Sequence, residues 1–281
     1  APDAYHFYFA DEVGTPGSVL TFFAWPNIKR GVRGNGETAA VAYNVPVDSL
    51  GFWQEHLQRN GISIQPLEER FDEQVLAFED PDGMRVELVA SGRSQETRYW
   101  EAGPIPQAHT LSGFHSVTLW LDEIEPTAQL LMDQMGYTFT GRIENRHRFI
   151  GGPESLARYV DILHRPGQPE DLPDAAIFGA GSIHHIAFRV PTDEIQLEYQ
   201  ASLRTQGFGV TPVRDRCYFH SIYFREPGGV LFEIATETPG FAIDEPVESL
   251  GESLQLPKWF EPDRALIQAN LPPLTLKQIE R

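Results

Sequence analysis

Hydrophobic and polar residues follow the same strand and helix pattern twice along the chain. Residues 39–46 (AAVAYNVP) and residues 182–191 (SIHHIAFRVP) are mostly apolar stretches that end at a proline, and each predicts a strand. Each stretch is followed by apolar residues at helical spacing and then by a glycine, Gly61 or Gly207, the residue type that most often follows a helix. The same unit of strand and helix therefore occurs twice.

The two predicted helices agree in their starts and in the faces that they bury. Asp48 or Ser49 is a candidate N-cap of the first helix and Thr192 of the second, because their side-chain oxygens accept hydrogen bonds from free backbone N–H groups. The apolar residues that recur at helical spacing are Leu50, Trp53 and Leu57 in the first helix and Ile195, Tyr199 and Leu203 in the second. We expect these side chains in the core.

The agreement continues downstream of both helices. In each copy a proline follows the helix-ending glycine after 20 residues (81 − 61 and 227 − 207), and a glutamate follows the proline after six (87 − 81 and 233 − 227). An acidic residue, a proline and a glycine at these places predict a hairpin turn before a closing strand. The closing strands carry Glu87 in the first of these copies and Glu233 in the second.

Two further segments match parts of the same unit. Residues 113–121 predict an opening strand, residues 125–135 a helix and residues 159–163 a closing strand, so they form a third copy with a degenerate closing half. Residues 11–23 match only the closing hairpin of a copy. We expect the opening strand and helix of that first copy to precede Ala1.

Short strands and helices in this order predict an α+β fold of repeated βαβββ modules. One module is too small to bury both faces of its sheet, so we expect the modules to pair into two curled barrels. Pairing in chain order gives an N-terminal domain at residues 1–95, with a truncated first module, and a C-terminal domain at residues 111–238. Residues 96–110 form a linker that packs on a surface, and residues 239–281 form a tail that packs on the body.

The charge of the chain excludes some classes of partner. The 22 basic and 40 acidic residues give a net charge of −18, which repels nucleic acid backbones and anionic membrane surfaces. No apolar stretch approaches the roughly 20 residues that span a bilayer. We therefore expect a cytoplasmic protein without nucleic acid or membrane partners, and the single cysteine, Cys217, fits a reducing compartment. The oligomeric state stays open, and a homo-oligomer is compatible with the sequence.

The repeat alignment singles out one pair of candidate metal ligands, His185 on an opening strand and Glu233 on a closing strand of the fourth module. The residues aligned with His185 are Ala40 and Ser116, and those aligned with Glu233 are Glu87, Asp161 and, in the incomplete module, Thr21. Only the fourth module thus combines a histidine with a carboxylate. An imidazole and a carboxylate that converge on one point suit iron, manganese or zinc.

Two ligands bind a metal weakly, so a third is required. His115 lies one residue from the matching position of the third module, and a shift of one residue turns a strand side chain to the opposite face. We therefore expect the third ligand to be a histidine on the opening strand of the first module, upstream of Ala1. Glu87 has no histidine in its own module and is expected to be solvated or salt-bridged.

Several polar residues lie near these ligands in the sequence. His184 precedes a ligand directly and points the other way unless a bulge redirects it, so the pattern alone predicts a structural role. Arg216 and Tyr223 lie on the two sides of the hairpin before the closing strand, where they either touch a bound anion or are simply exposed. Cys217 is expected to fill space, and the basic residues 27–36 to form a solvated loop.

Four stretches of the sequence carry a resemblance to a known family. They are YHFYFADEVGTPGSVLTFFAWP at residues 5–26, IHHIAFRVP at 183–191, YFREPGGVLFEIAT at 223–236 and LPKWFEPDRALIQANLPPL at 256–274. With the repeated βαβββ module, they resemble the glyoxalase or vicinal oxygen chelate superfamily, specifically its ring-cleaving extradiol dioxygenases of the (chloro)hydroquinone type. The likeness extends over essentially the whole chain.

The resemblance implies vicinal-oxygen-chelate barrels and a metal site. In that family a ferrous ion, sometimes manganese, is held by a histidine of the first module and by a histidine and a glutamate of the fourth, which fall on His185 and Glu233 here. Fe(II) is the expected cofactor, with Mn(II) and Zn(II) as alternatives, and a small aromatic compound and dioxygen are the expected substrates. The family also places residues that match His184, Arg216 and Tyr223 beside the aromatic substrate, as acid, base or anion-stabilising groups.

Two rival functions stay open at this point. A glyoxalase-type isomerase or lyase usually takes a ligand pair from each of two modules, whereas one complete pair is visible here. Zinc or nickel without oxygen consumption would favour it. A non-enzymatic protein that binds a small aromatic compound would contain no metal after purification.

Overall fold

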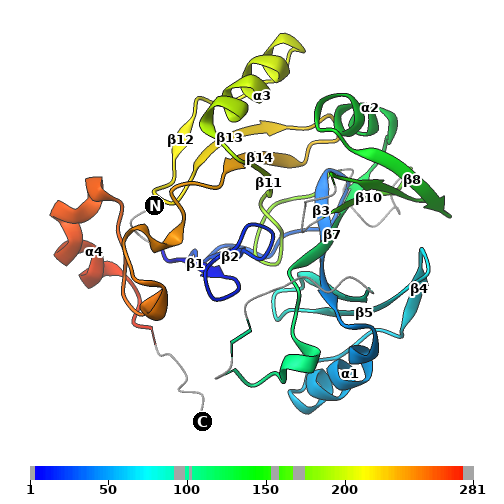
Figure 1. Cartoon of the computed structure of the whole chain (residues 1–281), viewed down its shortest axis with the longest axis horizontal. Helices are drawn as coiled ribbons and strands as arrows, with labels where there is room; N and C mark the ends of the chain where they lie inside the picture. Colours follow the sequence, from blue (N-terminus) through cyan, green and yellow to red (C-terminus); the bar gives the residue numbers. More distant parts are fainter. Residues whose placement is uncertain (1–3, 92–98, 101–102, 153–157, 167–174, 275–281) are drawn as a thin grey trace.

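The computed structural model describes residues 4–91, 99–100, 103–152, 158–166 and 175–274. Its strands form an eight-stranded sheet, a four-stranded sheet and a two-stranded sheet, and helices lie on the outer faces of the two larger ones (Figure 1). The predicted α+β class with repeated βαβββ modules is confirmed. The described residues include no helix that is long and apolar enough to span a membrane.

The second module contributes one half of the eight-stranded sheet. Its elements are β3 (Glu37–Val45), α1 (Leu50–Arg59), β4 (Glu68–Arg70), β5 (Glu73–Glu79) and β6 (Arg85–Ala90). Leu50, Trp53 and Leu57 of α1 are buried, as their spacing predicts. Ser49 is the N-cap residue, but its hydroxyl donates to the carbonyl of Ala108 at 3.2 Å instead of accepting from the helix.

The third module contributes the other half of this sheet. Its elements are β7 (Phe114–Leu121), α2 (Glu125–Gln129), a π-helical turn (Leu130–Gln134), β8 (Thr138–Ile143), β9 (Arg146–Ile150) and β10 (Tyr159–His164). β7 and β10 are parallel, and β9 is antiparallel to β10. The strand order of the third module is therefore the same as that of the second, with the opening strand beside the closing strand.

The two modules join through their opening strands. β3 and β7 pair antiparallel, with Val41 opposite Val117, and the resulting order is β4-β5-β6-β3-β7-β10-β9-β8. In each module the opening strand has one edge without a partner inside the module. Pairing the two edges satisfies their backbone N–H and C=O groups.

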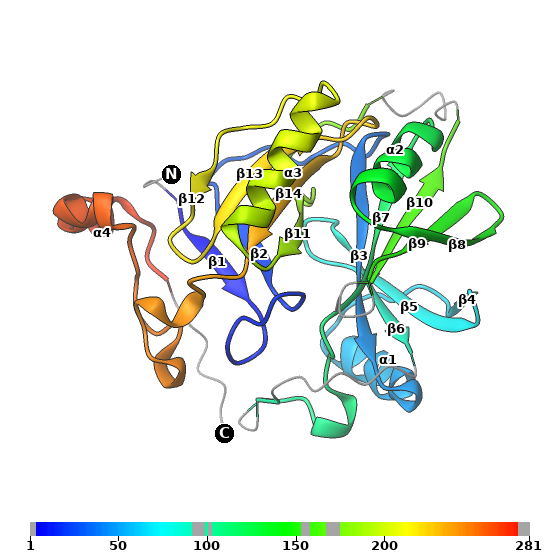
Figure 2. The same ribbon diagram turned by 45° about the horizontal axis from the view of Figure 1, so that its top comes forward.

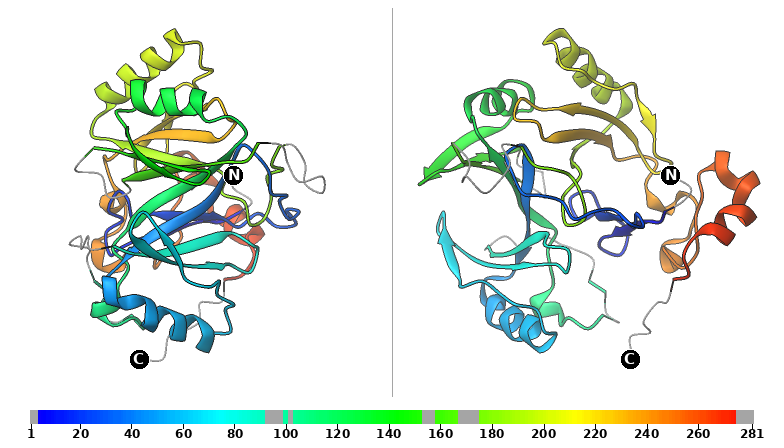
Figure 3. Two further views of the ribbon diagram at one scale, coloured as in Figure 1. Left: turned by 90° about the vertical axis from the view of Figure 1, so that its right-hand side faces the viewer. Right: turned by 180° about the vertical axis from the view of Figure 1, so that it is seen from behind.

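The fourth module forms the four-stranded sheet. Its elements are β11 (Ile186–Val190), α3 (Asp193–Thr205), β12 (Arg214–Asp215), β13 (His220–Arg225) and β14 (Leu231–Thr236). Thr192 caps α3 by accepting a hydrogen bond from the N–H of Ile195, and Leu203 of α3 is fully buried. Figure 3 shows α1 and α3 at opposite ends of the molecule, each outside its own sheet.

The closing hairpin of the first module lies against the fourth module. It consists of β1 (His6–Phe9) and β2 (Leu20–Phe23), which pair antiparallel with Tyr8 opposite Thr21. Figure 2 shows both strands beside β11, β13 and β14. Ring contacts join the two modules, among them Phe23 with His184 at 5.7 Å and Tyr8 with Tyr218 at 5.9 Å between centroids.

This pairing differs from the pairing that we expected. The sequence grouped modules in chain order, first with second and third with fourth, whereas the sheet joins the second to the third. Neighbours in sequence usually neighbour in space, but that tendency favours either grouping, because the second and third modules are also consecutive. The boundaries at residues 1–95, 96–110, 111–238 and 239–281 stay a prediction, and residues 92–98, 101–102, 153–157, 167–174 and 275–281 within them lie outside the described residues.

The linker and the tail both contact the body. Phe52 of α1 stacks on His109 with 4.2 Å between ring centroids, and Trp53 donates to the carbonyl of His109 at 3.0 Å. The tail contains α4 (Arg264–Asn270), which Figure 1 places at the side of the molecule. Tyr5 donates to the carbonyl of Pro272 at 3.1 Å, so the tail also contacts the first described residues.

Residues 27–36 are exposed at 27–30 and at Val32, as expected of a solvated loop, whereas residues 33–36 are buried or half-buried. They run beside residues 175–183, with backbone bridges that include Val32 with Ile177 and Thr38 with Ile183. A Cβ atom on Gly34 would lie 2.5 Å from the backbone nitrogen of Ala176, so only glycine permits this approach. The bridge at Ile183 ties the chain just before β11 to the start of β3.

Gln196 connects α3 to the sheet below it. Its side chain is buried and its amide donates to the carbonyls of His220 and Ile234, at 2.8 Å each, on the two strands that carry the candidate site. We expect Gln196→Leu to lower the free energy of unfolding by about 2 kcal/mol, because both carbonyls lose a buried donor. Urea denaturation followed by tryptophan fluorescence measures this loss.

Gln206→Leu is the matched control, since it makes the same exchange at an exposed position at the end of α3. Its effect should stay below about 0.5 kcal/mol. Equal losses from both exchanges would contradict the structural role of the Gln196 amide.

Candidate metal centre

His185 and Glu233 are in contact in the fourth module. His185 directly precedes β11, and Glu233 lies on β14, which is parallel to β11 with Ala187 opposite Glu233. Nε2 of His185 lies 2.7 Å from Oε2 of Glu233. The imidazole and the carboxylate that the repeat alignment singled out are therefore in direct contact.

The Glu233 carboxylate is buried, with 2% of the residue exposed. Ser221 and Tyr223, two residues apart on β13, both donate hydroxyl hydrogen bonds to Oε1, and the Tyr223 bond is 2.7 Å long. Burial raises the pKa of Glu233, but the hydrogen bonds and charge of His185 and the two hydroxyl donors outweigh it and lower the pKa below the usual range. The carboxylate is thus held ionised, with Oε2 directed at His185.

Arg216 and Tyr223 extend this set of contacts towards solvent. Nε of Arg216 donates to the phenol oxygen of Tyr223 at 3.1 Å, and the guanidinium lies 5.1 Å from the centre of the tyrosine ring. Burial, followed by the negative charge of Glu233, raises the pKa of Tyr223 to about 12. The phenol therefore keeps its proton at neutral pH and donates it to Glu233 in a hydrogen bond.

His184 contacts His185 instead of pointing away from it. The two Nδ1 atoms are 2.8 Å apart and the rings are perpendicular, with an interplanar angle of 89°. Both residues precede β11, which begins at Ile186, so the strict alternation of a strand does not apply to them. Burial and the neighbouring His185 lower the pKa of His184 to about 4.

Aromatic side chains pack beside the two histidines. The Phe23 ring lies 5.7 Å from His184 and 6.5 Å from His185, and Trp25 stacks on Phe23 at 4.6 Å with an interplanar angle of 5°. Phe178 lies 5.0 Å from the His184 ring. The candidate ligands therefore face a wall of flat apolar rings that comes from β2 and from the segment before β11.

Two residues of this site escaped the sequence analysis. His6 and Tyr8 lie on the same face of β1, and Nδ1 of His6 is 2.9 Å from the Tyr8 hydroxyl. Burial, followed by the charges of His185 and Arg216, lowers the pKa of His6 to about 4. Tyr8 lies opposite Thr21, just as Tyr223 lies opposite Glu233, so the alignment of Thr21 with Glu233 held the signal that was missed.

The described residues contain no group of three or more His, Cys, Asp or Glu side chains arranged to hold a metal ion. His115, the offset candidate, lies on β7 and contacts Glu73 of the second module, with 3.0 Å between Nε2 and Oε1. His220 contacts Asp193 at 2.7 Å, and the backbone N–H of Cys217 donates to Asp215. The third ligand thus stays a prediction, as a histidine before Ala1.

The donors that are present fit a divalent cation. A ligating imidazole usually donates its second ring N–H to a fixed partner, and His185 has such a partner in Nδ1 of His184. A ligating carboxylate is likewise held by hydrogen bonds, here from Ser221 and Tyr223. One nitrogen and one carboxylate oxygen are then directed at the same point, as an iron, manganese or zinc site requires.

Comparison with known proteins identifies the family. Residues 113–234 match the family model described as the Glyoxalase/Bleomycin resistance protein/Dioxygenase superfamily. MhqO of Bacillus subtilis, named as a candidate ring-cleaving dioxygenase, is 38% identical over 99% of this chain and 86% of its own length. The chain therefore belongs to the Glyoxalase/Bleomycin resistance protein/Dioxygenase superfamily.

Two further proteins that are similar to this chain are also named as dioxygenases. The chlorohydroquinone/hydroquinone 1,2-dioxygenase of Sphingobium indicum is 35% identical over 91% of this chain and 79% of its own length. The crystal structure of a candidate dioxygenase from Bacillus subtilis superposes with a TM-score of 0.92 and 38% identity, over 99% of this chain and 87% of that one. The predicted resemblance to ring-cleaving dioxygenases of this superfamily is confirmed.

Ser221 provides a test of the metal centre that does not depend on activity. It is fully buried, it donates to Glu233, and Val75 takes its place in the second module, where no ligand pair exists. We expect Ser221→Ala to weaken divalent metal binding by about 10- to 100-fold, because Glu233 loses one of the donors that orient it. Competition with a chromogenic chelator measures the change.

Ser202→Ala is the control, because it removes the same hydroxyl from an exposed position on α3. Unchanged metal affinity in Ser221→Ala, or an equal loss in Ser202→Ala, would be incompatible with a supporting role of Ser221 at the metal.

Proposed function

We propose that the protein is a metal-dependent dioxygenase that opens the ring of a hydroquinone- or catechol-like aromatic compound with dioxygen. The contact of His185 with Glu233, next to Tyr223, Arg216 and an aromatic wall, carries this proposal. One relative is named for ring cleavage and another as a chlorohydroquinone/hydroquinone 1,2-dioxygenase. A small aromatic compound and dioxygen are thus the proposed substrates.

Fe(II) is the proposed metal, with Mn(II) and Zn(II) as alternatives. His185 and Glu233 are two of its ligands in this proposal, and a histidine upstream of Ala1 is the third. These three residues would hold the metal, and a ferrous ion bound there would supply the electron transfer between the aromatic substrate and dioxygen.

Tyr223 and Arg216 are proposed to act on the hydroxyl groups of the substrate. The phenol of Tyr223 lies between the buried carboxylate and the guanidinium, so it is held in one orientation by both. In this position it can donate a proton to an oxygen of the substrate, while Arg216 stabilises a substrate hydroxyl that has lost its proton. Arg216 is exposed, which places the positive charge on the side from which substrate approaches.

His184 is proposed to hold His185 and to border the substrate. Its contact with Nδ1 of His185 leaves Nε2 of that ring for the metal, because one nitrogen cannot serve both partners. The rings of Phe23, Trp25 and Phe178 contact the His184 ring edge to face. A flat aromatic substrate fits such a wall by edge or stacking contacts.

Activity measurements test the assignment directly. The protein is purified without oxygen, its metal is measured, and oxygen uptake is followed with hydroquinone and with catechol after addition of Fe(II), Mn(II) or Zn(II). We expect ring opening with Fe(II) or Mn(II), and loss of metal and activity in Glu233→Ala. Tyr223→Phe and Arg216→Ala should each lower kcat by about 10²- to 10⁴-fold, because a proton donor or an anion-stabilising charge is lost.

Tyr199→Phe is the matched control for Tyr223→Phe, since Tyr199 lies on α3 and packs against the core of the third and fourth modules. It should retain the parental kcat. Zinc or nickel as the native metal without oxygen uptake would replace the proposal by an isomerase or lyase. Purification without metal, together with undiminished binding of aromatics, would replace it by a binding protein.

A further inference from the structure

Strand register gives all three complete modules a carboxylate at the same place. Each of these carboxylates lies on the closing strand, between one residue of the opening strand and one of the strand on its other side. The three sets are Glu233 between Ala187 and Tyr223, Glu87 between Ala42 and Ala77, and Asp161 between Thr118 and Arg148. The register thus confirms the equivalence of Glu87 and Asp161 with the candidate ligand Glu233.

The second and third modules lack the histidine that accompanies this carboxylate. Two residues before the opening-strand partner, the fourth module has His185, whereas the other two have Ala40 and Ser116. Yet Glu87 is 2% exposed and Asp161 is fully buried. An ionised carboxylate in such a place is costly unless a positive charge and hydrogen-bond donors meet it.

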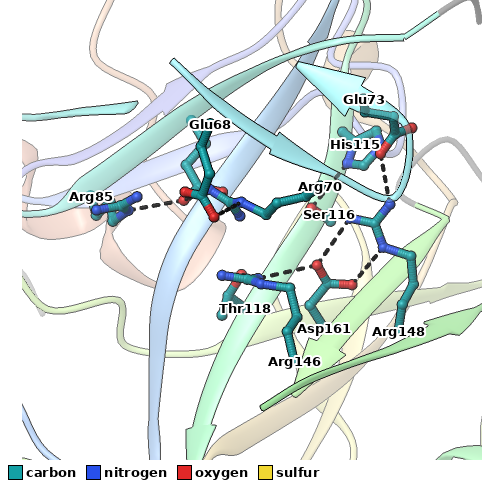
Figure 4. A network of polar contacts seen from close by, with 11 residues as sticks. Glu68, Arg70, Glu73, Arg85, His115, Ser116, Thr118, Arg146, Arg148 and Asp161 are labelled. Atoms are coloured by element: carbon teal, nitrogen blue, oxygen red, sulfur yellow. Dashed lines mark hydrogen bonds and ion pairs between the residues drawn. The ribbon is translucent and has the colours of Figure 1, made fainter. Parts of the chain in front are cut away.

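Arginine side chains provide that charge (Figure 4). Arg70 donates to both oxygens of Glu87, at 3.0 and 2.9 Å. Arg148 donates to both oxygens of Asp161, at 2.8 and 3.0 Å, and Arg146 adds a bond of 3.1 Å. Burial raises the pKa of Glu87, but Arg70 outweighs this effect and holds the pKa at about 2.

A difference in one residue between the second and fourth modules explains how Arg70 reaches Glu87. Arg70 follows Gly61 by nine residues and Arg216 follows Gly207 by nine, so the two arginines are repeat equivalents (70 − 61 and 216 − 207). In the fourth module Tyr223 lies between Arg216 and the carboxylate. In the second module Ala77 takes the place of the tyrosine, and Arg70 contacts the carboxylate directly.

Arg148 lies among groups that are themselves typical metal ligands. Its Nη1 donates to Glu73 of the second module at 2.6 Å, while Nε and Nη2 contact Asp161. His115 also contacts Glu73, because the register of β3 and β7 shifts between Ser116 and Phe114 and this bulge turns His115 into the cluster. The guanidinium therefore contacts two carboxylates, and one of them, Glu73, also contacts the imidazole and links the two modules.

We propose that this cluster is the counterpart of the candidate metal centre, in which arginine guanidinium groups take the place of the cation. Arg148 occupies the position where His115, Glu73 and Asp161 would otherwise hold a divalent ion. The comparison rests on the metal role proposed for Glu233. The second and third modules consequently need no metal, and Glu73 of β5 joins the second module to His115 of β7 and Arg148 of β9 in the third.

Two substitutions at Arg148 separate the effect of its charge from the effect of the volume that its side chain fills. The guanidinium is packed against the rings of Phe71 and Tyr159, at 4.2 and 4.6 Å. Arg148→Met keeps this packing and fills the position, whereas Arg148→Ala removes the charge and leaves room for a hydrated cation. Both exchanges are made in a parent variant, His185→Ala with Glu233→Gln, which disables the candidate metal centre.

We expect the parent variant to bind no Mn²⁺, and the added Arg148→Ala to create binding of about one Mn²⁺ per chain, measured by loss of the EPR signal of free Mn²⁺. Mn²⁺ should also raise the midpoint of thermal unfolding of the Arg148→Ala variant, since a ligand that binds only the folded state stabilises it. The Arg148→Met variant should show neither effect, and adding Asp161→Ala should abolish both in the Arg148→Ala variant.

Three results would overturn the proposal. They are Mn²⁺ binding by the parent variant that is lost on Asp161→Ala, no Mn²⁺ binding by the Arg148→Ala variant in either its folded or its refolded state, and equal Mn²⁺ effects in the alanine and methionine variants. If Arg148→Ala prevents folding without metal, refolding that depends on Mn²⁺ supports the proposal. Failure of the proposed function appears separately, as equal metal content in the unmodified protein and the parent variant.

Discussion

A carboxylate in the middle of a buried sheet must be matched by positive charge or hydrogen-bond donors. The residues around the closing strand of each complete module depend on that requirement. The closing strand of every complete module carries such a group, at Glu87, Asp161 and Glu233. In the second and third modules guanidinium groups donate hydrogen bonds to it. In the fourth module the neighbours are an imidazole and two hydroxyl groups, which leave the carboxylate able to serve a metal ion.

The candidate site also depends on which modules pack against one another. The fourth module supplies His185, Glu233 and the hydroxyl groups that hold them, while the hairpin of the first module covers them with His6, Tyr8 and Phe23. A sheet that must bury its inner face needs a second layer, and here the two layers come from opposite ends of the chain. The candidate site therefore lies between modules that are far apart in sequence.

The sequence predicted the modules and the approach of His185 to Glu233, because both depend on spacing within a module. Glycine, proline and glutamate recur at fixed intervals, and these intervals fix which residues share a position on neighbouring strands. Three features could not be predicted in this way. The grouping of modules depends on which free strand edges meet, the orientation of His184 depends on where β11 begins, and that of His115 depends on a bulge.

The same limit applies to residues 27–36. Their glycines and basic residues are typical of an exposed loop, and only the partner segment at residues 175–183 reveals why glycine is needed there. His6 and Tyr8 are a different case, since their alternation on β1 was visible and the alignment of Thr21 with Glu233 already placed them opposite the site. Here the sequence held the information, but the incomplete module concealed it.

The bridge between Thr38 and Ile183 has a consequence for how the protein can be divided. It fixes the register of the chain two residues before His185 by means of β3, a strand of the other sheet. A fourth module expressed alone would keep its own ladder but lose this external anchor, so His185 could slip relative to Glu233. The two sheets are thus separate in their hydrogen bonding, but the position of His185 depends on both. A circular permutation would have to preserve the contact between Thr38 and Ile183.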